Sequence, residues 1–150
     1  MRTQLVCDWM TRDPITINGD ATLLEARRLM KENATRCLPV TDNGELVGIV
    51  TSDEVYDALA AEIISHNGRP NSTIAVSTIM MRVPFAVSPL TPVGLAAQIM
   101  LEHGISGLPV MVGDKLLGLI TDGDILRTLV SKATASAFDK SSRRARCAVV

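Results

Sequence analysis

The hydrophobic and polar positions of this chain follow one order twice. Shifting the sequence by 70 residues brings 6–59 into gapless register with 76–129 and gives 14 identities in 54 positions. Average amino-acid usage gives roughly three or four identities by chance. The match predicts an internal duplication that organises the whole chain. The identical pairs include Met10/Met80, Arg12/Arg82, Pro14/Pro84, Leu38/Leu108, Pro39/Pro109, Val40/Val110, Gly48/Gly118 and Thr51/Thr121.

Each half opens with a short extended piece followed by a helix. The extended pieces are 14–17 and 84–87, and their leading proline suits the start of a strand. Apolar residues then recur at helical spacing, which predicts one amphipathic helix in each half. The expected N-caps are Asp20 or Thr22, with Thr22 and Glu25 in a capping-box pattern, in the first half, and Thr91, followed by Pro92 at the first helical position, in the second.

A hairpin and a second helix complete each half. Two apolar runs, 37–41 and 45–50, flank Asn43-Gly44, which is a strong hairpin signal. The runs 107–112 and 115–120 flank a Gly-Asp turn in the same way. Second helices are predicted to start near Ser52 and Asp122, with apolar positions at Val55, Leu59, Ile63, Ile125 and Leu129.

These elements predict an α/β (α+β) fold of two β-α-β-β-α repeats, packed with pseudo-two-fold symmetry around a cleft. The first repeat spans 1–64, a polar linker spans 65–72 and the second repeat spans 73–132. Beyond Ser131 the apolar pattern stops. We predict that 133–150 forms a poorly ordered tail, which carries the basic residues Arg143, Arg144 and Arg146.

Composition excludes several classes of protein. The chain has 150 residues, of which 47% are hydrophobic, so a chain disordered throughout is excluded. The net charge of −1 and only four aromatic residues make a nucleic-acid partner unexpected. The uncharged stretch 83–101 approaches the length of a membrane span, but Pro84, Pro89, Pro92 and Gly94 would break such a helix.

Cysteine and histidine usage argues against metal and disulfide chemistry. The three cysteines have no C-x-x-C spacing, so a disulfide framework or structural zinc site is not expected. We interpret them as buried thiols of a protein in the reducing cytoplasm. With two histidines, one in the linker and one at a helix end, neither a metal site nor a catalytic triad is predicted.

The junction from the last strand into the last helix carries the most informative motif. Residues 48–54 and 118–124 share the order glycine, two hydrophobic residues, threonine, two further residues and an acid. A helix N-terminus offers N–H groups and positive dipole character to a phosphate, and the acid can accept both hydroxyls of a ribose diol. The same pattern is also a capping box that needs no ligand. Both interpretations stay open on the residues alone.

Together with the repeated Leu-Pro-Val at 38–40 and 108–110, these features resemble a tandem pair of cystathionine-β-synthase (CBS) domains, a Bateman module, over roughly 1–132. The resemblance implies a regulatory module rather than an enzyme. It implies an adenosine-containing ligand such as AMP, ADP or ATP, and sometimes NAD or S-adenosylmethionine, held in clefts between the repeats. No cofactor is required. A flat homodimer and an effector protein on another chain are also implied.

The resemblance also assigns site residues, position by position. Thr121 would hold phosphate and Asp124 the ribose diol, with Asp122 beside them, while Thr51 and Glu54 would be their counterparts in the other cleft. Glu54 departs from the usual aspartate, so we expect the Asp124 cleft to bind better. The adenine would lie against Ile15, Thr16, Phe85 and Ala86, and the phosphates against 35–37, Ile105, Ser106 and Gly107, with Arg36 a partner by charge.

Two other classes of function compete with ligand sensing. One is a partner-binding or dimerisation scaffold whose clefts are empty or hold a different adenosyl ligand. The other is a nucleotide-hydrolysing enzyme, but the chain has no G-x-x-x-x-G-K-[ST] or G-x-G-x-x-G motif and no nucleophile–base arrangement. We therefore predict neither catalytic nor metal-ligating residues.

Overall fold

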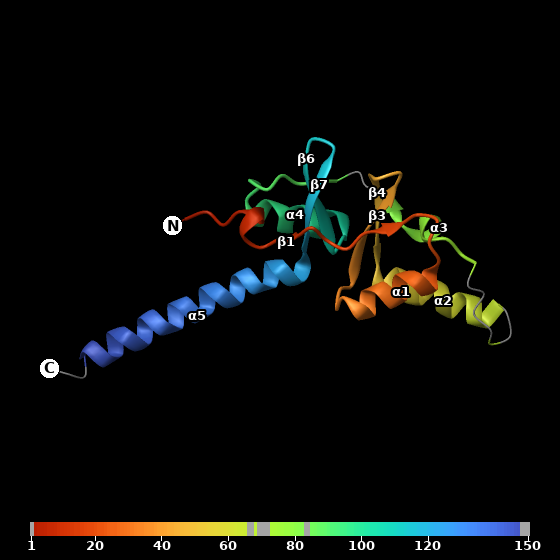
Figure 1. The fold of residues 1–150 in the computed structure, drawn as a ribbon. Coiled ribbons are helices and arrows are strands. Elements are labelled where there is room, and N and C mark those ends of the chain that lie inside the picture. The colour runs from red at the N-terminus through yellow and green to blue at the C-terminus, as the bar shows by residue number, and fades with distance from the viewer. Residues whose placement is uncertain (1, 66–67, 69–72, 83–84, 148–150) are drawn as a thin grey trace.

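The computed structural model describes residues 2–65, 68, 73–82 and 85–147, with side-chain surroundings up to residue 135. Figure 1 shows two lobes, each built on a small sheet with helices packed against it. In chain order the elements are η1 (Val6–Asp8), β1 (Thr11–Arg12), β2 (Ile17–Asn18), α1 (Leu23–Glu32), β3 (Cys37–Asp42), β4 (Glu45–Thr51), α2 (Ser52–Ser65), α3 (Val76–Ile79), β5 (Met81–Arg82), α4 (Val93–His103), β6 (Gly107–Val112), β7 (Lys115–Thr121) and α5 (Asp122–Cys147).

The two hairpins confirm the duplication. Cys37 pairs with Thr51 across β3 and β4, and Gly107 pairs with Thr121 across β6 and β7, with the same register along both ladders. Each ladder shifts register at one place, after Val40 and after Val110. The first turn follows the predicted geometry, because Asn43 and Gly44 both have positive φ, as a two-residue hairpin turn requires. The two repeats are therefore alike in backbone as well as in sequence.

The repeats exchange their leading segments. The sheet of the first lobe has the order β2-β3-β4-β5, so β5 from the second half completes it. The sheet of the second lobe has the order β1-β7-β6, so β1 from the first half joins it, while Val87 forms an isolated parallel bridge to Val110 on the far side. The exchange ties the two halves together, because each lobe needs a strand from the other.

The exchanged segments also accept hydrogen bonds from the first amide of the first helix in each lobe. The backbone N–H of Leu23 donates to the carbonyl of Ile74 at 3.1 Å, and that of Val93 donates to the carbonyl of Gln4 at 2.9 Å. Thr22 is the N-cap of α1, and its hydroxyl accepts from the amide of Glu25, as predicted. The predicted cap of α4 is wrong. Pro92 is the N-cap of that helix, and the Thr91 hydroxyl instead accepts from Ser88.

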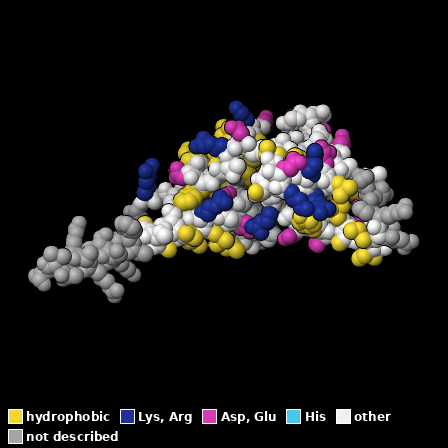
Figure 2. Space-filling model, turned by 60° about the horizontal axis from the view of Figure 1, so that its bottom comes forward, with side chains coloured by type: hydrophobic (Ala, Val, Ile, Leu, Met, Phe, Trp, Pro, Cys, Tyr) yellow, Lys and Arg dark blue, Asp and Glu magenta, His cyan; other side chains and the backbone are white. Residues whose placement is uncertain are grey.

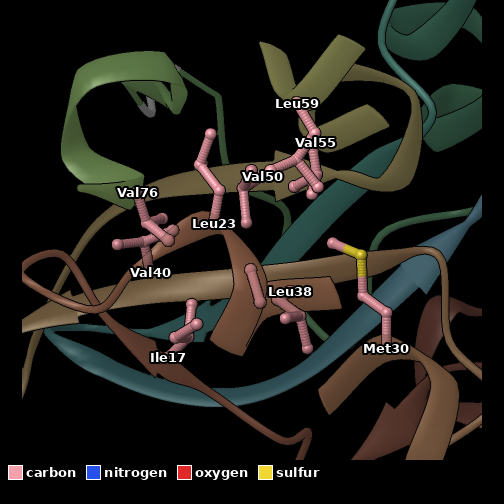
Figure 3. Packing of buried hydrophobic residues seen from close by; sticks show 10 residues of the cluster. Ile17, Leu23, Met30, Leu38, Val40, Val50, Val55, Leu59 and Val76 are labelled. Atoms are coloured by element: carbon pink, nitrogen blue, oxygen red, sulfur yellow. The ribbon is translucent and has the colours of Figure 1, made fainter. Parts of the chain in front are cut away.

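Each lobe has its own hydrophobic core between sheet and helices. Figure 3 shows the core of the first lobe, where Val76 of α3 packs beside Leu23, Val40 and Val50. The second core has the equivalent composition, with Val6 of η1 packed among Leu108, Val110 and Ile120. Thus one valine of each exchanged segment is fully buried in the other half's core, where it anchors that segment.

A third, smaller cluster joins the lobes. Side chains alternate between the two faces of a strand, so Ile49 points away from the core that holds Val50. Leu119 does the same in β7, and the two residues pack with Cys37. Hydrophobic contact on the inner faces of both sheets therefore holds the lobes together and leaves the ends of the strands beside a cleft.

The first position of each repeated motif must be glycine for a steric reason. A Cβ atom on Gly48 would lie 2.7 Å from the carbonyl oxygen of Met81, and one on Gly118 would lie 2.7 Å from that of Thr11. Both oxygens belong to the exchanged strands β5 and β1. Glycine therefore stands at these two positions because a neighbouring backbone approaches closely.

The second helices begin at Ser52 and Asp122, as predicted. Ile63 is 44% exposed and Leu129 is 57% exposed, whereas Glu62 is buried. Residues 133–147 are part of α5. No proline or glycine follows Gly123, so nothing interrupts the helix, and Figure 1 shows α5 extending away from both lobes.

Candidate ligand-binding cleft

A cleft with a volume of about 400 Å³ lies between the lobes. The first lobe contributes the end of α1 and the beginnings of β3 and α2, and the second contributes the junction of β7 and α5. The link between β1 and β2 closes one side. The lining residues are Thr11, Asp13, Pro14, Ile15, Asn33, Ala34, Thr35, Arg36, Cys37, Thr51, Ser52, Asp53, Ser106, Leu119, Thr121, Asp122, Gly123, Asp124 and Arg127.

Asp124 is the most strongly held polar side chain of this cleft. It is 4% exposed, and its Oδ2 atom accepts hydrogen bonds from the amide and the hydroxyl of Thr121, at 2.9 and 3.0 Å. Its Oδ1 atom accepts from Nη1 of Arg127 at 2.9 Å. Because these partners are the residue before α5 and a residue of its second turn, the carboxylate is fixed at the start of that helix.

The expectation of free N–H groups at this helix start is wrong. The amides of Thr121 and Gly123 donate to the carboxylates of Asp124 and Asp122, at 2.9 and 2.7 Å. The amide of Asp122 donates to the carbonyl of Ser106 at 3.0 Å. A short acidic side chain at a helix start bonds the nearest orphan amide, so the motif satisfies its own donors. The hydrogen bonds found are those of the capping interpretation.

Arg127 and Arg36 supply the positive charge of the cleft. The Arg127 side chain is 74% exposed, so solvent screens its ion pair with Asp124 and the pair is weak. Arg36 is exposed and forms no ion pair among the described residues. Either guanidinium can therefore turn towards an anionic group in the cleft.

Cys37 lies at the floor of the cleft, where it is buried against the other lobe. A Cβ atom on Gly107 would be only 2.9 Å from its Sγ atom, so the thiol and the glycine backbone are in close contact. Burial raises the pKa of the Cys37 thiol to about 12, and the negative charges of Glu54 and Asp122 act in the same direction. The thiol is therefore protonated and unreactive at neutral pH.

The equivalent site on the other side of the pseudo-two-fold axis is nearly closed. It has a volume of about 20 Å³ and apolar walls. Glu54 makes the same bond as Asp124, because its Oε2 atom accepts from the amide of Thr51 at 2.9 Å. Five predicted residues line this small cavity: Thr51, Phe85, Ile105, Ser106 and Gly107.

The structure divides the predicted site residues among several places. The large cleft brings together Ile15, Arg36, Thr51, Ser106, Thr121, Asp122 and Asp124. Thr16 is not among its lining residues and faces an open groove beside Thr41 and Lys115 instead, because neighbours on extended backbone point in opposite directions. Ala86 and Glu54 line neither cleft. These three expectations are corrected accordingly.

Three charged residues of the cleft, Asp13, Asp53 and Arg127, were not predicted from the sequence. Arg127 stands three positions after Asp124, the spacing at which helical side chains pair, and that spacing could have identified it. Asp13 carries no such signal, since its place in the lining depends on β1 crossing to the second lobe. Within the described part of the chain, no cluster of three or more His, Cys, Asp or Glu side chains could hold a metal ion. No helix there is long and apolar enough to cross a bilayer.

The comparisons with known proteins agree with this geometry. The family model for the CBS domain matches 6–61 and again 76–131. A CBS domain-containing protein of Dictyostelium discoideum is 33% identical over 132 residues, covering 84% of this chain and 91% of the relative. The inosine-5'-monophosphate dehydrogenase of Korarchaeum cryptofilum is 36% identical over 118 residues, covering 78% of this chain but only 22% of the enzyme.

Solved structures of ligand complexes are also similar. The CBS domain pair of protein MJ0100, in complex with 5'-methylthioadenosine and S-adenosyl-L-methionine, has a TM-score of 0.73 at 28% identity and covers 87% of this chain and 99% of that one. CBSX2 in complex with AMP has a TM-score of 0.66 at 26% identity and covers 86% and 98%. The chain thus belongs to the CBS domain family and carries a tandem CBS pair, a Bateman module, over residues 6–131.

Proposed function

We propose that this CBS pair is a regulatory module that binds an adenosine-containing ligand in the cleft beside Asp124 and transmits its binding to a partner protein. The observation that carries the proposal is the open cleft of about 400 Å³, which places Thr121 and Asp124 of one lobe opposite Arg36 of the other. Its size falls within the range of small-molecule sites. Relatives of the same fold are in complex with AMP and with S-adenosyl-L-methionine.

Asp124 supports recognition of a ribose. An ionised carboxylate has about four acceptor positions, and three of those on Asp124 are used by Thr121 and Arg127. One position is open, and a second opens when the exposed Arg127 side chain turns away. The two hydroxyls of a vicinal diol would then form charge-assisted hydrogen bonds to this carboxylate.

Ile15 and Arg36 support the other ends of the ligand. Ile15 is 44% exposed and lines the cleft as an apolar surface on which a base can pack. Arg36 can pair with a phosphate oxygen through its planar guanidinium. Because the ligand would contact both lobes, its binding would favour one relative arrangement of the lobes over others. That differential affinity is the means by which the module would signal.

Exposed apolar side chains support association with a second copy or an effector. Leu126, Leu129 and Val130 of α5 are each more than half exposed. Figure 2 shows hydrophobic side chains on the surface where α5 leaves the body. We propose that this surface forms a homodimer. We also propose a reducing, cytoplasmic location, where the free thiols Cys7 and Cys37 would stay reduced.

A scaffold without a ligand is the second candidate, and the capping hydrogen bonds between Thr121 and Asp124 favour it. A thermal-shift screen over AMP, ADP, ATP, NAD and S-adenosylmethionine separates the two. A ligand that binds the folded state stabilises it by RT ln(1 + [L]/Kd), so a sensor must melt at a higher temperature with at least one of them. If none shifts the melting temperature, the scaffold is the correct interpretation.

Two further measurements test the details. Asp124→Ala removes charge-assisted hydrogen bonds worth about 1.5–3 kcal/mol each, so affinity should fall at least about tenfold. Unchanged affinity in calorimetry would show that the ligand lies elsewhere. Incubation with ATP and Mg²⁺ should give no turnover, and hydrolysis would show that the module is an enzyme after all.

A further inference from the structure

The charges that line the open cleft are mainly negative. Four carboxylates face it, from Asp13, Asp53, Asp122 and Asp124, against the guanidinium groups of Arg36 and Arg127. Arg127 already pairs with Asp124 at 2.9 Å. Among the described residues, Arg36 is therefore the one cation of the lining that is available to an anionic ligand without breaking an ion pair.

Two helix starts line the cleft, and both carry acidic residues. The first residues of α2 and α5, Ser52 and Asp122, both line it. Their amides donate to the carbonyls of Arg36 and Ser106, at 2.8 and 3.0 Å. Acidic residues also occupy the first turn of both helices and offset their positive dipole ends. A row of phosphates would meet carboxylates at both helix starts, where the first amide of each helix is already bonded.

Cys37 is also affected by nearby negative charge. Besides burial, the carboxylates of Glu54 and Asp122 raise the pKa of its thiol. Cys37 lines the floor of the cleft, next to the starts of both helices. The negative charges therefore act on the cavity itself and not only on its rim.

We propose that this cleft selects adenosyl ligands that carry no more negative charge than a monophosphate, and that it discriminates against di- and triphosphates. This inference rests on the proposed function and narrows its ligand class. One phosphate can pair with Arg36. Further phosphates add negative charge that no free cation of the lining balances, because Arg36 already pairs with the first phosphate. The exposed carboxylates of Asp53 and Asp122 repel that added charge, and the repulsion is strongest at low ionic strength.

Calorimetric titration with adenosine, AMP and ATP tests this selection, in low salt with EDTA so that the triphosphate keeps its full charge. AMP should bind at least about tenfold more tightly than ATP, and added salt should narrow that ratio by screening. Asp53→Asn and Asp122→Asn should also narrow it. The matched control is Asp57→Asn, an exposed carboxylate of α2 outside the cleft lining, which should leave the ratio unchanged.

The outcomes distinguish a failure of the charge selection from a failure of the proposed adenosyl-binding function. ATP binding as tightly as AMP, or more tightly, would overturn the charge selection and leave the adenosyl site standing. A ratio that Asp53→Asn and Asp57→Asn change equally would also overturn it. If none of the three compounds binds, the proposed function itself is wrong and the selection falls with it. Asp53 is exposed and, within the described part of the chain, its side chain forms no hydrogen bond, so its variant serves even if Asp122→Asn does not fold.

Discussion

Replacing Gly118 by alanine tests whether the exchanged segments are essential to the fold. The new Cβ atom would lie 2.7 Å from the Thr11 carbonyl oxygen and 2.7 Å from the Met10 sulfur. The methionine side chain can turn aside, but the carbonyl belongs to β1, which is paired with β7 at this point. The strand must therefore move away from the sheet.

The size of the effect follows from these contacts. Overpacking of this kind costs about 1–3 kcal/mol. Each backbone hydrogen bond lost between β1 and β7 adds about 1 kcal/mol. The free energy of unfolding should therefore fall by about 2–5 kcal/mol, a large part of the roughly 5–15 kcal/mol that holds a typical domain.

Urea denaturation measures the loss, and hydrogen exchange locates it. Amides of residues 5–12 should exchange faster in Gly118→Ala than in the wild type, because this segment would be released first. Gly94→Ala is the matched control: no atom lies within 4 Å of its Cβ position, and alanine in a helix should stabilise by about 0.5–1 kcal/mol. Unchanged stability of Gly118→Ala, or a loss without faster exchange of 5–12, would refute the reasoning.

Three further predictions concern side chains near the cleft. The pKa of Cys37 rises from 9.0, the value of an ordinary thiol, to about 12 in the fold, so the unfolded chain loses this proton at a lower pH than the folded chain. Between pH 9 and 12 the wild type should therefore lose stability relative to Cys37→Ala, at up to about 1.4 kcal/mol per pH unit. Parallel curves of unfolding free energy against pH for the two proteins would contradict this. Gly107→Ala should destabilise the fold by about 1–3 kcal/mol, since its Cβ would lie 2.9 Å from Cys37 Sγ. In a double-mutant cycle Cys37→Ala should relieve part of that loss, whereas strictly additive losses of the two variants would show that the two residues are not in contact. Thr22→Ala should cost about 1 kcal/mol in thermal or urea unfolding through the lost N-cap of α1, and no change would mean that the cap bond contributes nothing.

Local signals predicted much of the fold. The Asn43-Gly44 turn and the Thr22 cap depend on neighbouring residues, and the 70-residue shift depends only on comparing the sequence with itself. The structure confirms all three. The exchange of β1 and β5 could not be predicted in the same way. A repeat in sequence shows that two segments are equivalent, but not which of two equivalent sheets each one joins.

The site was predicted less completely, for two physical reasons. Motif reasoning identified Thr121 and Asp124, but it treated the amides of the helix start as free, whereas the motif's own carboxylates bond two of them and the Ser106 carbonyl a third. The difference between the clefts depends on tertiary packing. Glu54 and Asp124 occupy equivalent positions, yet one cavity has about 20 Å³ and the other about 400 Å³.

That asymmetry supplies the most direct test of the account. Calorimetric titration of AMP into the wild type should give one bound ligand per chain. Asp124→Ala should abolish or strongly weaken that binding, and Glu54→Ala, the matched change at the closed cleft, should keep it. Two equal sites per chain, or binding lost in Glu54→Ala and retained in Asp124→Ala, would contradict the assignment of the ligand to the cleft between Arg36 and Asp124.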